Sequence, residues 1–291
     1  MVLITRAMPL TGKVDASFLP QGTSFLFVGD VHGQWQATTR LLSALSRIAD
    51  RATPRVLVTL GDIVHKGPQS RRCLRAALGD EFAERAGADT HIRLLGNHEI
   101  LLARALIALE QGREGRPWIA AWAKAGGLAL LSSWSKDRPG TLEDRLARWR
   151  DGFPVVRLAG LGTWLPSWTC GNLHAVHAGL DPEGDNSAMG AMDAYVEARP
   201  RLRKHSTHWA TVRAPFLDHT EGFGGRLVVH GHTPHRALFT HPPKTGHEVG
   251  RILDRTASHG RLCLDGGSGY NIGVAGALVE NGTFRIAFAP C

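Results

Sequence analysis

The ten residues SFLFVGDVHG, at positions 24–33, decide the expected fold. Their first half, Ser24–Val28, is a short apolar run of the kind that forms a strand buried on both faces. The run stops at Gly29 and Asp30, and His32 follows two positions after the acid. In an open α/β sheet the carboxyl ends of the strands line one edge, and ligands bind there. The stretch therefore predicts a buried strand with a polar site at its end.

Two further segments repeat this arrangement of strand, polar turn and helix. Arg55–Leu60 predicts a second buried strand and His91–Leu95 a third. Apolar residues at helical spacing predict helices over Gln34–Ala49, Ser70–Ala86 and Glu99–Glu110. Three successive strand-to-helix units predict an α/β core whose sheet is at least partly parallel.

The rest of the chain predicts further strands and a group of helices. The strands are expected at Val155–Leu158, Asn172–Val176, Leu227–His230 and Leu262–Asp265, with a terminal β-hairpin over Ala277–Phe288. Residues 111–150 carry four tryptophans and helical patterns. They predict either an inserted helical cap or additional core helices. We expect one domain over residues 1–291, built from two sheets.

The composition is that of a globular protein with a basic surface. The chain has 291 residues, with 34 Lys+Arg against 26 Asp+Glu and a formal net charge of +8. This surplus favours anionic partners such as phosphorylated substrates and nucleotides, but a generally basic solvated surface explains it as well. The sequence has no RNA-binding motif, basic aromatic stripe or zinc finger, so we expect no nucleic-acid partner.

Other features favour a soluble protein in a reducing compartment. The four cysteines lie far apart and form no Cys-x-x-Cys pair, which is typical of reduced thiols. No apolar stretch approaches the roughly 20 residues that a membrane helix needs. The first residues lack the pattern of a signal peptide. We expect a cytoplasmic protein without membrane attachment.

Polar side chains capable of binding metal follow five of the predicted strands. Carboxylate, imidazole and amide groups form a mixed set that favours Mn, Fe, Zn or Co over Mg or Ca. Six ligands are too many for one four-coordinate zinc ion and suit two ions that share a bridging carboxylate. The six residues are Asp30, His32, Asp62, Asn97, His177 and His232.

The motifs around these residues resemble those of the calcineurin-like metallophosphoesterases. They are GDVHG at 29–33, GDIVHKG at 61–67, GNHE at 96–99, HAG at 177–179 and GHTP at 231–234. The match is closest to the branch of serine/threonine phosphoprotein phosphatases and symmetrical diadenosine tetraphosphatases, and it spans about residues 24–270. The resemblance implies an α/β fold of two mixed β-sheets packed as a sandwich and flanked by helices, with a dinuclear metal centre at its edge.

The resemblance also implies a role for each metal-binding residue. Asp30 and His32 would hold one divalent ion, and Asp62 would bridge to the second. The second ion's shell would be completed by Asn97, His177 and His232. Two Mn²⁺ ions are the expected cofactors, with Fe, Zn or Co as alternatives. A hydroxide between the two ions would attack phosphorus in line.

The remaining family roles concern the substrate. His98 would act as general acid to the leaving oxygen or stabilise the transition state. Phosphate would be bound by Lys66 and Arg213, together with Asn97. Tyr270, after a run of glycines, lies either in a tight turn or in a wall of the substrate site.

Three positions depart from the phosphatase pattern. His65 stands where phosphatases carry the Asp that pairs with the acid histidine, which leaves the protonation of His98 open. Lys66 replaces an arginine, and a point charge orients phosphate less firmly than a bidentate fork. Leu95 stands where phosphatases carry another arginine. Diadenosine tetraphosphatases tolerate the loss of the Asp and share the Gly-Pro-x-Ser pattern, which is GPQS at residues 67–70 of this chain.

The sequence favours a metal-dependent phosphoesterase that hydrolyses phosphomonoesters in the manner of serine/threonine phosphoprotein phosphatases. The alternative is a symmetrical hydrolase of diadenosine tetraphosphate. A third hypothesis is a metal-binding protein whose catalysis has been lost through the changes at His65 and Leu95. His230, two positions before His232, is a further candidate ligand because both would point to the same face of a strand.

Overall fold

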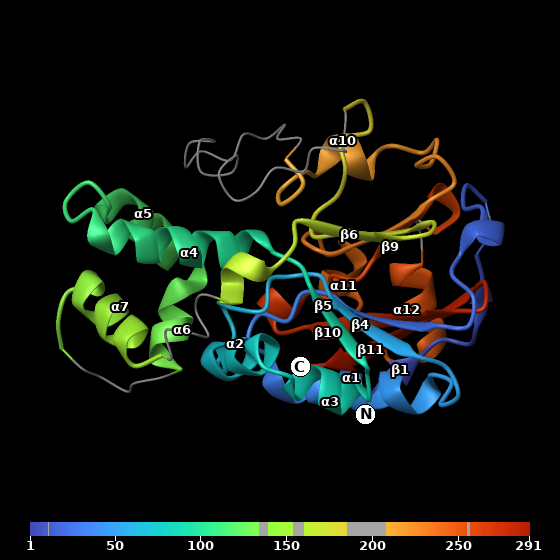
Figure 1. The fold of residues 1–291 in the computed structure, drawn as a ribbon, viewed down its shortest axis with the longest axis horizontal. Helices are drawn as coiled ribbons and strands as arrows, with labels where there is room; N and C mark the ends of the chain where they lie inside the picture. Colours follow the sequence, from blue (N-terminus) through green and yellow to red (C-terminus); the bar gives the residue numbers. More distant parts are fainter. Residues whose placement is uncertain (11, 134–138, 154–159, 185–207, 255–256) are drawn as a thin grey trace.

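Two β-sheets form the centre of the molecule, and helices lie below and beside them (Figure 1). The computed structural model describes residues 1–291 except 11, 134–138, 154–159, 185–207 and 255–256. The predicted strand Val155–Leu158 lies outside the described residues.

The larger sheet has seven strands in the order β1-β11-β10-β3-β4-β5, with β2 paired to β11. Their bounds are β1 Leu3–Ile4, β2 Met8–Pro9, β3 Ser24–Val28, β4 Arg55–Thr59, β5 Thr90–Arg93, β10 Gly273–Glu280 and β11 Thr283–Pro290. Strands β3, β4 and β5 are parallel, as the sequence predicts, and β10 pairs antiparallel with β3. The predicted hairpin is β10–β11, and Asn281 and Gly282 take the positive φ values of 47° and 73° that a type I′ turn requires.

The smaller sheet has four strands in the order β6-β7-β8-β9. These are β6 Ser167–Cys170, β7 Leu173–Val176, β8 Leu227–His230 and β9 Arg261–Cys263. Strand β6 runs antiparallel to β7, and the other pairs are parallel. Both sheets are therefore mixed, which confirms the predicted fold class. The sequence analysis missed β6, a short strand at the edge of its sheet.

The core lies on both faces of the larger sheet because successive side chains of a strand point to opposite faces. In β3, Phe25 and Phe27 join the cluster that includes Leu173 and Val229 of the smaller sheet. Leu26 and Val28 instead join the cluster formed with the helices on the other face. This double burial explains the continuous apolar run at 24–28.

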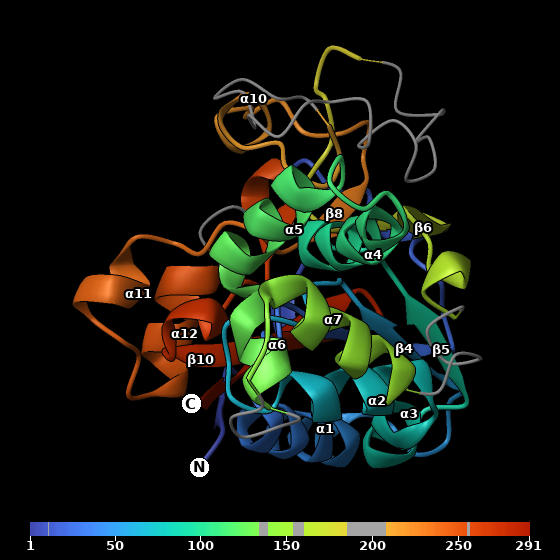
Figure 2. The same ribbon diagram turned by 90° about the vertical axis from the view of Figure 1, so that its left-hand side faces the viewer.

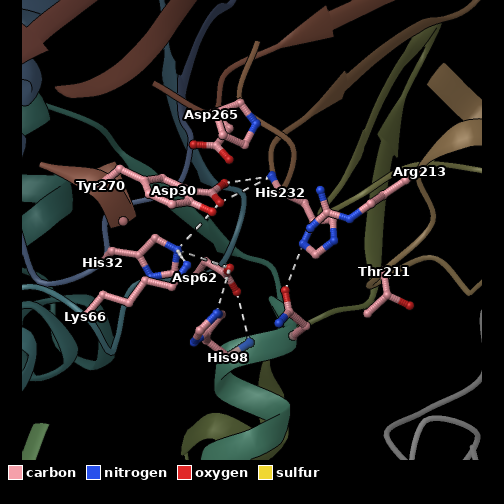
Figure 3. A pocket seen from close by; sticks show the side chains of 13 residues that line it. Asp30, His32, Asp62, Lys66, His98, Thr211, Arg213, His232, Asp265 and Tyr270 are labelled. Carbon is pink, nitrogen blue, oxygen red and sulfur yellow. Dashed lines mark hydrogen bonds and ion pairs between the residues drawn. The ribbon is translucent and has the colours of Figure 1, made fainter. Parts of the chain in front are cut away.

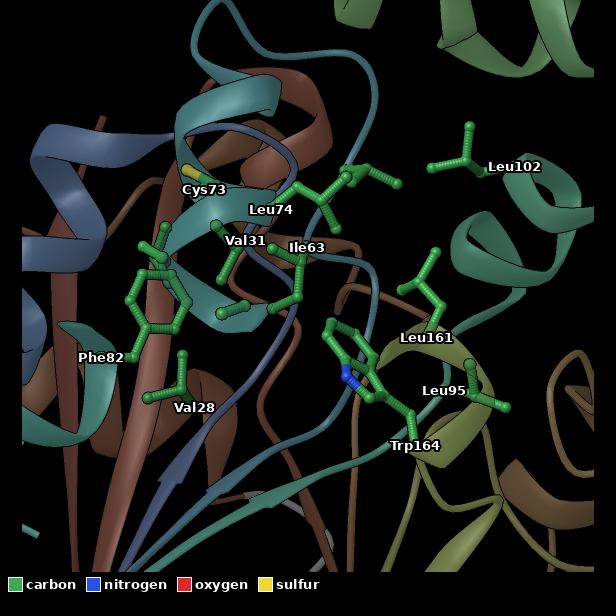
Figure 4. Close-up of a cluster of buried hydrophobic side chains, with 14 of the residues drawn as sticks. Val28, Val31, Ile63, Cys73, Leu74, Phe82, Leu95, Leu102, Leu161 and Trp164 are labelled. Carbon is green, nitrogen blue, oxygen red and sulfur yellow. The ribbon is translucent and has the colours of Figure 1, made fainter. Parts of the chain in front are cut away.

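Helices α1 Trp35–Ile48, α2 Ser70–Leu78 and α3 Glu81–Ala86 cover the outer face of the larger sheet. Figure 4 shows Val28, at the end of β3, beside Phe82 of α3, in the cluster that also includes Cys73 and Leu74 of α2. The single helix predicted over Ser70–Ala86 is wrong, because α2 ends at Gly79, whose extended backbone (φ −99°, ψ −159°) separates it from α3.

The helices that follow β5 form a group beside the sheets (Figures 1 and 2). They are α4 Asn97–Glu110, α5 Arg116–Trp122, a π-helical turn at Ala123–Gly127, α6 Leu128–Ser132 and α7 Leu142–Asp151. Helices α5 and α7 pack on α4, and α6 contacts α2. The helical character predicted for 111–150 is present in its described residues. The single domain with an inserted cap stays a prediction.

The remaining helices are short and lie near the smaller sheet and the chain's end. They are α10 Ala214–Leu217, α11 Ala237–Thr240 and α12 Gly246–Leu253, with 3₁₀ turns at Ala16–Phe18, Gly160–Thr163, Ala257–His259 and Ser268–Tyr270. Within the described part of the chain, no helix combines the length and the apolar character needed to cross a bilayer.

Candidate active site

The carboxyl ends of strands from both sheets meet at one pocket of about 280 Å³ (Figure 3). Of the site residues that the sequence predicts, all but His177 and the further candidate His230 belong to its lining. The lining residues are Asp30, His32, Asp62, Lys66, Asn97, His98, Thr211, Arg213, His232, Pro234, Asp265, Gly269 and Tyr270. His177 is fully buried behind them and contacts Asp62 and Asn97.

The turns that carry these side chains have unusual backbone conformations. Seven non-glycine residues of the described chain have positive φ, and five of them belong to the turns after β3, β4 and β8. The five are His32, Asp62, His65, Lys66 and His232. Such conformations cost energy and persist where the surrounding structure holds them, often at functional sites.

Glu99 supplies much of that support at the turn after β4. Its carboxylate accepts hydrogen bonds from the backbone N–H groups of Asp62 (2.7 Å), Ile63 (2.9 Å) and Val64 (3.2 Å). It also accepts the N–H of Gly96 at 3.0 Å, at the start of α4. Burial raises the pKa of Glu99 to about 7. The sequence analysis quoted Glu99 within a motif but gave it no role.

Asp62 lies at the centre of two groups of side chains that could each hold a metal ion. One group is His32, Asp62 and His98, and the other is Asp62, His177 and His232. In each group the potential ligand atoms lie within 4.8 Å of one another. The Asp62 Oδ1 atom also accepts the backbone N–H of His98 at 3.0 Å, at the N-terminus of α4. A carboxylate shared by two groups has the placement that a bridging ligand needs.

Backbone carbonyls orient two histidines in a way that suits metal binding. His32 directs Nδ1 to the carbonyl of Val64 at 3.0 Å, and His177 directs Nδ1 to that of Leu60 at 2.8 Å. A carbonyl oxygen only accepts, so each Nδ1 carries a proton, and the lone pair of Nε2 is the one that either ring could offer to a metal. Both Nε2 atoms face Asp62, at 3.5 Å for His32 and 3.4 Å for His177.

Acceptor atoms converge around His177. Its Nε2 lies 3.1 Å from Asn97 Oδ1 as well as 3.4 Å from Asp62 Oδ1, and Asn97 Oδ1 lies 2.9 Å from His232 Nδ1. Lone pairs pointing at one another repel unless a proton or a cation lies between them. Burial alone would lower the pKa of His177, but the charge and hydrogen bond of Asp62, the charge of Asp30 and the carbonyl of Leu60 together raise that pKa to about 10. The donor set therefore fits a divalent cation.

Asp30 and Asp265 add negative charge on the other side of the pocket. Asp30 accepts the backbone N–H of His232 at 3.0 Å. Burial raises the pKa of Asp30 well above its ordinary value, and the charges of Asp265 and Asp62 add to the effect. Burial likewise raises the pKa of Asp265 to about 6. Bound cations would relieve this crowding of carboxylates.

The sequence analysis overlooked Asp265 as a site residue. The signal was present, because a predicted strand ends there and Gly266-Gly267 follows, as glycines border the other polar turns.

His98 differs from the other histidines of the pocket. Its Nδ1 faces Nδ1 of His65 at 2.8 Å instead of a carbonyl, and its Nε2 lies 3.9 Å from Asp62 Oδ2. The second nitrogen of His65 accepts the indole N–H of Trp122 at 2.8 Å. Burial lowers the pKa of His65 to about 3 and holds that of His98 well below its ordinary value. Both rings are neutral near pH 7.

Two exposed cations border the pocket from opposite sides (Figure 3). Lys66 Nζ lies 3.3 Å from His32 Nε2 and 5.5 Å from the centre of the Tyr270 ring. Arg213 donates from Nη1 to Thr233 Oγ1 at 3.1 Å. Both face the space where a phosphate would lie, as the resemblance implies, and their phosphate-binding role stays a prediction.

A second, larger pocket of about 810 Å³ adjoins the first and shares Arg213, Pro234 and Tyr270 with it. His230 lines this second pocket and not the first. It therefore lies apart from the two candidate ligand groups. The glycine-rich segment ending at Tyr270 forms part of the wall of both pockets.

The family model for calcineurin-like phosphoesterases matches residues 23–254 of this chain. The chain therefore belongs to that family, which confirms the resemblance and agrees with the two mixed sheets.

Two curated proteins illustrate the relationship. A symmetrical bis(5′-nucleosyl)-tetraphosphatase from Paracidovorax citrulli is 36% identical over 147 residues, which is 49% of this chain and 45% of that protein. The chain thus spans about half the length of this relative. A zinc-dependent endopolyphosphatase from Saccharomyces cerevisiae is 31% identical over 236 residues, covering 72% of this chain and 66% of that protein.

Among solved structures, a putative diadenosine tetraphosphatase aligns over 92% of this chain and 94% of its own, with 20% identity and a TM-score of 0.48.

Proposed function

We propose that this chain is a dinuclear metal-dependent hydrolase of phosphoric anhydrides in nucleotides, with dinucleoside polyphosphates as its substrates. The observation that carries the dinuclear part is Asp62, which belongs to both groups of potential ligands. One ion would be held by Asp30, His32 and Asp62, since Nε2 of His32 lies 3.9 Å from Asp30 Oδ2 and 3.5 Å from Asp62 Oδ2. Asp62 would share the second ion with Asn97, His177 and His232.

When bound, two divalent cations supply the Lewis acidity that activates water for attack on phosphorus near neutral pH. The chain's residues supply the rest. Lys66 and Arg213 neutralise the phosphate from opposite sides of the pocket, and Asn97 can donate its amide N–H to a phosphate oxygen. His98 aims Nε2 at the same space, beside Asp62. Asp62 would hold the two cations together.

The second pocket supports the nucleotide as substrate. It continues from the phosphate pocket through Tyr270, and its volume of about 810 Å³ suffices for a nucleoside. The rings of Phe239 and Tyr270, 47% and 60% exposed, lie at its edge with centroids 4.9 Å apart. Exposed aromatic faces stack on nucleobases. His230 Nε2, buried and without a hydrogen-bond partner in the described structure, adds a polar atom in the wall.

The relatives support the same substrate class. The tetraphosphatase and the endopolyphosphatase are both named for substrates with phosphoanhydride bonds. The zinc dependence in the second name agrees with imidazole-rich ligands, and it keeps zinc beside manganese as a candidate metal.

A substrate panel tests the proposal. The full chain, loaded with Mn²⁺ or Zn²⁺, is assayed with diadenosine tetraphosphate and with a phosphoserine peptide. We expect kcat/KM for the nucleotide to exceed that for the peptide by at least about tenfold. An Asp62→Asn preparation controls for a contaminating hydrolase. A preference for the peptide would instead support the phosphomonoesterase hypothesis.

The phosphomonoesterase hypothesis remains the alternative, since the pocket of about 280 Å³ admits a single phosphate group with an attached side chain. The hypothesis of lost catalysis predicts metal binding without turnover of any phosphate ester. The cytoplasmic location and the absence of a nucleic-acid partner stay predictions.

A further inference from the structure

Trp122 connects the helical segment to the candidate active site through one hydrogen bond. Its side chain is fully buried at the end of α5, and its Nε1 lies 2.8 Å from His65 Nε2. The Nδ1 of His65 lies 2.8 Å from Nδ1 of His98. Both histidines are buried, so water does not compete for these atoms.

The hydrogen-bond donors and acceptors around His65 and His98 allow only one position for the proton of each neutral ring. An indole nitrogen only donates, so Nε2 of His65 must accept from Trp122. The single proton of a neutral His65 ring is then on Nδ1, and it is donated to Nδ1 of His98. The proton of His98 is consequently on Nε2, the atom that faces Asp62 and the pocket.

The position of its proton also distinguishes His98 from the histidines that could bind a metal ion. A histidine that binds a cation through Nε2 needs its lone pair there and its proton on Nδ1, as the carbonyl contacts of His32 and His177 provide. His98 has the opposite arrangement, although its Nε2 lies near Asp62.

We propose that Trp122, acting through His65, fixes the proton of His98 on Nε2, the atom that faces the pocket, and thereby favours substrates whose leaving group departs with a hydrogen bond from His98 and without a full proton transfer. A second proton on His98 would go to Nδ1 and oppose the N–H of His65. Moving the His65 proton to Nε2 would oppose the N–H of Trp122. We call the hydrogen-bonded chain of Trp122, His65 and His98 the relay. It permits hydrogen bonding by His98 but resists full proton transfer from an imidazolium.

The chemistry of the leaving group decides whether hydrolysis needs full proton transfer from His98. In hydrolysis, the oxygen of water bonds to phosphorus, and the bond to the leaving oxygen breaks with its electron pair on that oxygen. A water proton passes to solvent. A nucleoside diphosphate or nitrophenolate is stable as the departing anion, whereas the alkoxide of serine needs a proton from a general acid. This inference rests on the proposed function and narrows it to phosphoanhydrides and aryl phosphates.

The packing around Trp122 holds the relay in place. A Cβ added at Gly127 would lie 2.3 Å from Trp122 Cε2, so the π-helical turn closes directly on the indole ring. In the same turn, Gly126 has a φ of 104° and its carbonyl accepts the backbone N–H of Lys66 at 3.2 Å. π-Helical turns of this kind are frequent at functional sites.

The first test reads the proton positions directly. Side-chain ¹⁵N NMR of the zinc-loaded full chain distinguishes the two neutral tautomers of a histidine. We expect His98 as the Nε2–H form and His65 as the Nδ1–H form. In Trp122→Phe, which keeps an aromatic ring and removes the N–H, we expect His65 and His98 to populate both tautomers. Trp118→Phe, on the same helix beside Arg104, is the matched control and should leave both unchanged.

The second test measures leaving-group preference. The ratio of kcat/KM for p-nitrophenyl phosphate to that for phosphoserine should fall about tenfold in Trp122→Phe, with metal content unchanged, and stay constant in Trp118→Phe. Finding Nδ1–H on His98 in the unmodified chain would overturn the proposal, whatever the activity. An unchanged ratio in Trp122→Phe would also overturn it. Failure to cleave diadenosine tetraphosphate would refute the proposed function while the tautomer measurement still decides the relay.

Discussion

The strand ends and the helical segment contribute to the pocket in different ways. The turns after β3, β4 and β8 place polar side chains directly in it, and the carbonyl of Val64 orients one of them, His32. The carbonyl of Leu60 orients His177 in the same way, behind the lining and after β7. Helix α5 places no side chain in the lining, and it acts through the N–H of Trp122 on His65.

The difference reflects two separate requirements, one for metal binding and one for the position of the proton on His98. Metal ligands need fixed geometry and charge, which the rigid edge of two sheets provides. The proton on His98 needs only one donor at the right distance, which a packed side chain of another segment supplies. Changes at the strand ends should therefore abolish the reaction, whereas changes along the relay should alter which substrates are cleaved.

The largest effect is expected at Asp62. Asp62→Asn removes the carboxylate that both ligand groups share, so turnover should fall by about 10³-fold and bound metal should decrease. Metal analysis and a p-nitrophenyl phosphate assay measure both effects, with the exposed Asp151→Asn as control. Two ions still bound, with normal turnover, would contradict the bridging assignment.

A smaller effect, of opposite sign, is expected at His65. In His65→Asp, a carboxylate would accept both the Trp122 N–H and an N–H from Nδ1 of His98, which favours the imidazolium form of His98. Turnover of phosphoserine should then rise by about tenfold or more. A decrease, or no change, would show that the His98 proton does not limit cleavage of alkyl esters.

Changes in the second pocket should alter the binding of the nucleotide substrate more than the rate of its hydrolysis. Phe239→Ala removes an exposed ring at the edge of that pocket, so KM for diadenosine tetraphosphate should rise by about tenfold, the loss of one stacked base. The KM for p-nitrophenyl phosphate, which has no nucleoside, should stay constant. Equal changes for both substrates would place the nucleoside elsewhere.

The smallest effect is a pH dependence of the free energy of unfolding that comes from His174, a residue outside the pocket. Burial lowers the pKa of His174 in β7 from 6.5 to about 4, and Arg226 adds to the effect. Between these values the unfolded chain binds more protons than the folded one, so the free energy of unfolding falls as pH decreases from 6.5. The contribution to the free energy of unfolding is on the order of 3 kcal/mol.

His174→Gln tests this contribution because it can keep a hydrogen bond to Thr169, which lies 2.7 Å from His174 Nδ1, without titrating. Its stability, followed by denaturant unfolding of the metal-free chain, should decline less steeply below pH 6.5 than that of the unmodified chain. Parallel curves would show that His174 is not buried as a neutral group.

The sequence predicted the strand ends well because a buried apolar run followed by glycine and a polar residue determines both the strand and its functional end. It missed β6, whose four residues lack a continuous apolar pattern. It also missed the break at Gly79 within an otherwise helical stretch. Local propensity does not decide such boundaries when tertiary packing does.

The contacts of Trp122 could not be predicted in the same way. A tryptophan at helical spacing is usually a core residue, and the sequence does not show that its N–H meets His65, 57 positions away. Glu99 is similar, since its role depends on backbone N–H groups 35 to 37 positions earlier in the chain. Both contacts arise only when separate segments pack together.

We propose above that the pocket cleaves phosphoanhydride bonds of dinucleoside polyphosphates. The most direct measurement incubates the manganese-loaded chain with diadenosine tetraphosphate and resolves the products by ion exchange. We expect two molecules of ADP from each substrate molecule, as for a symmetrical hydrolase. Intact substrate, in a preparation that hydrolyses p-nitrophenyl phosphate, would contradict this account and favour phosphomonoesters.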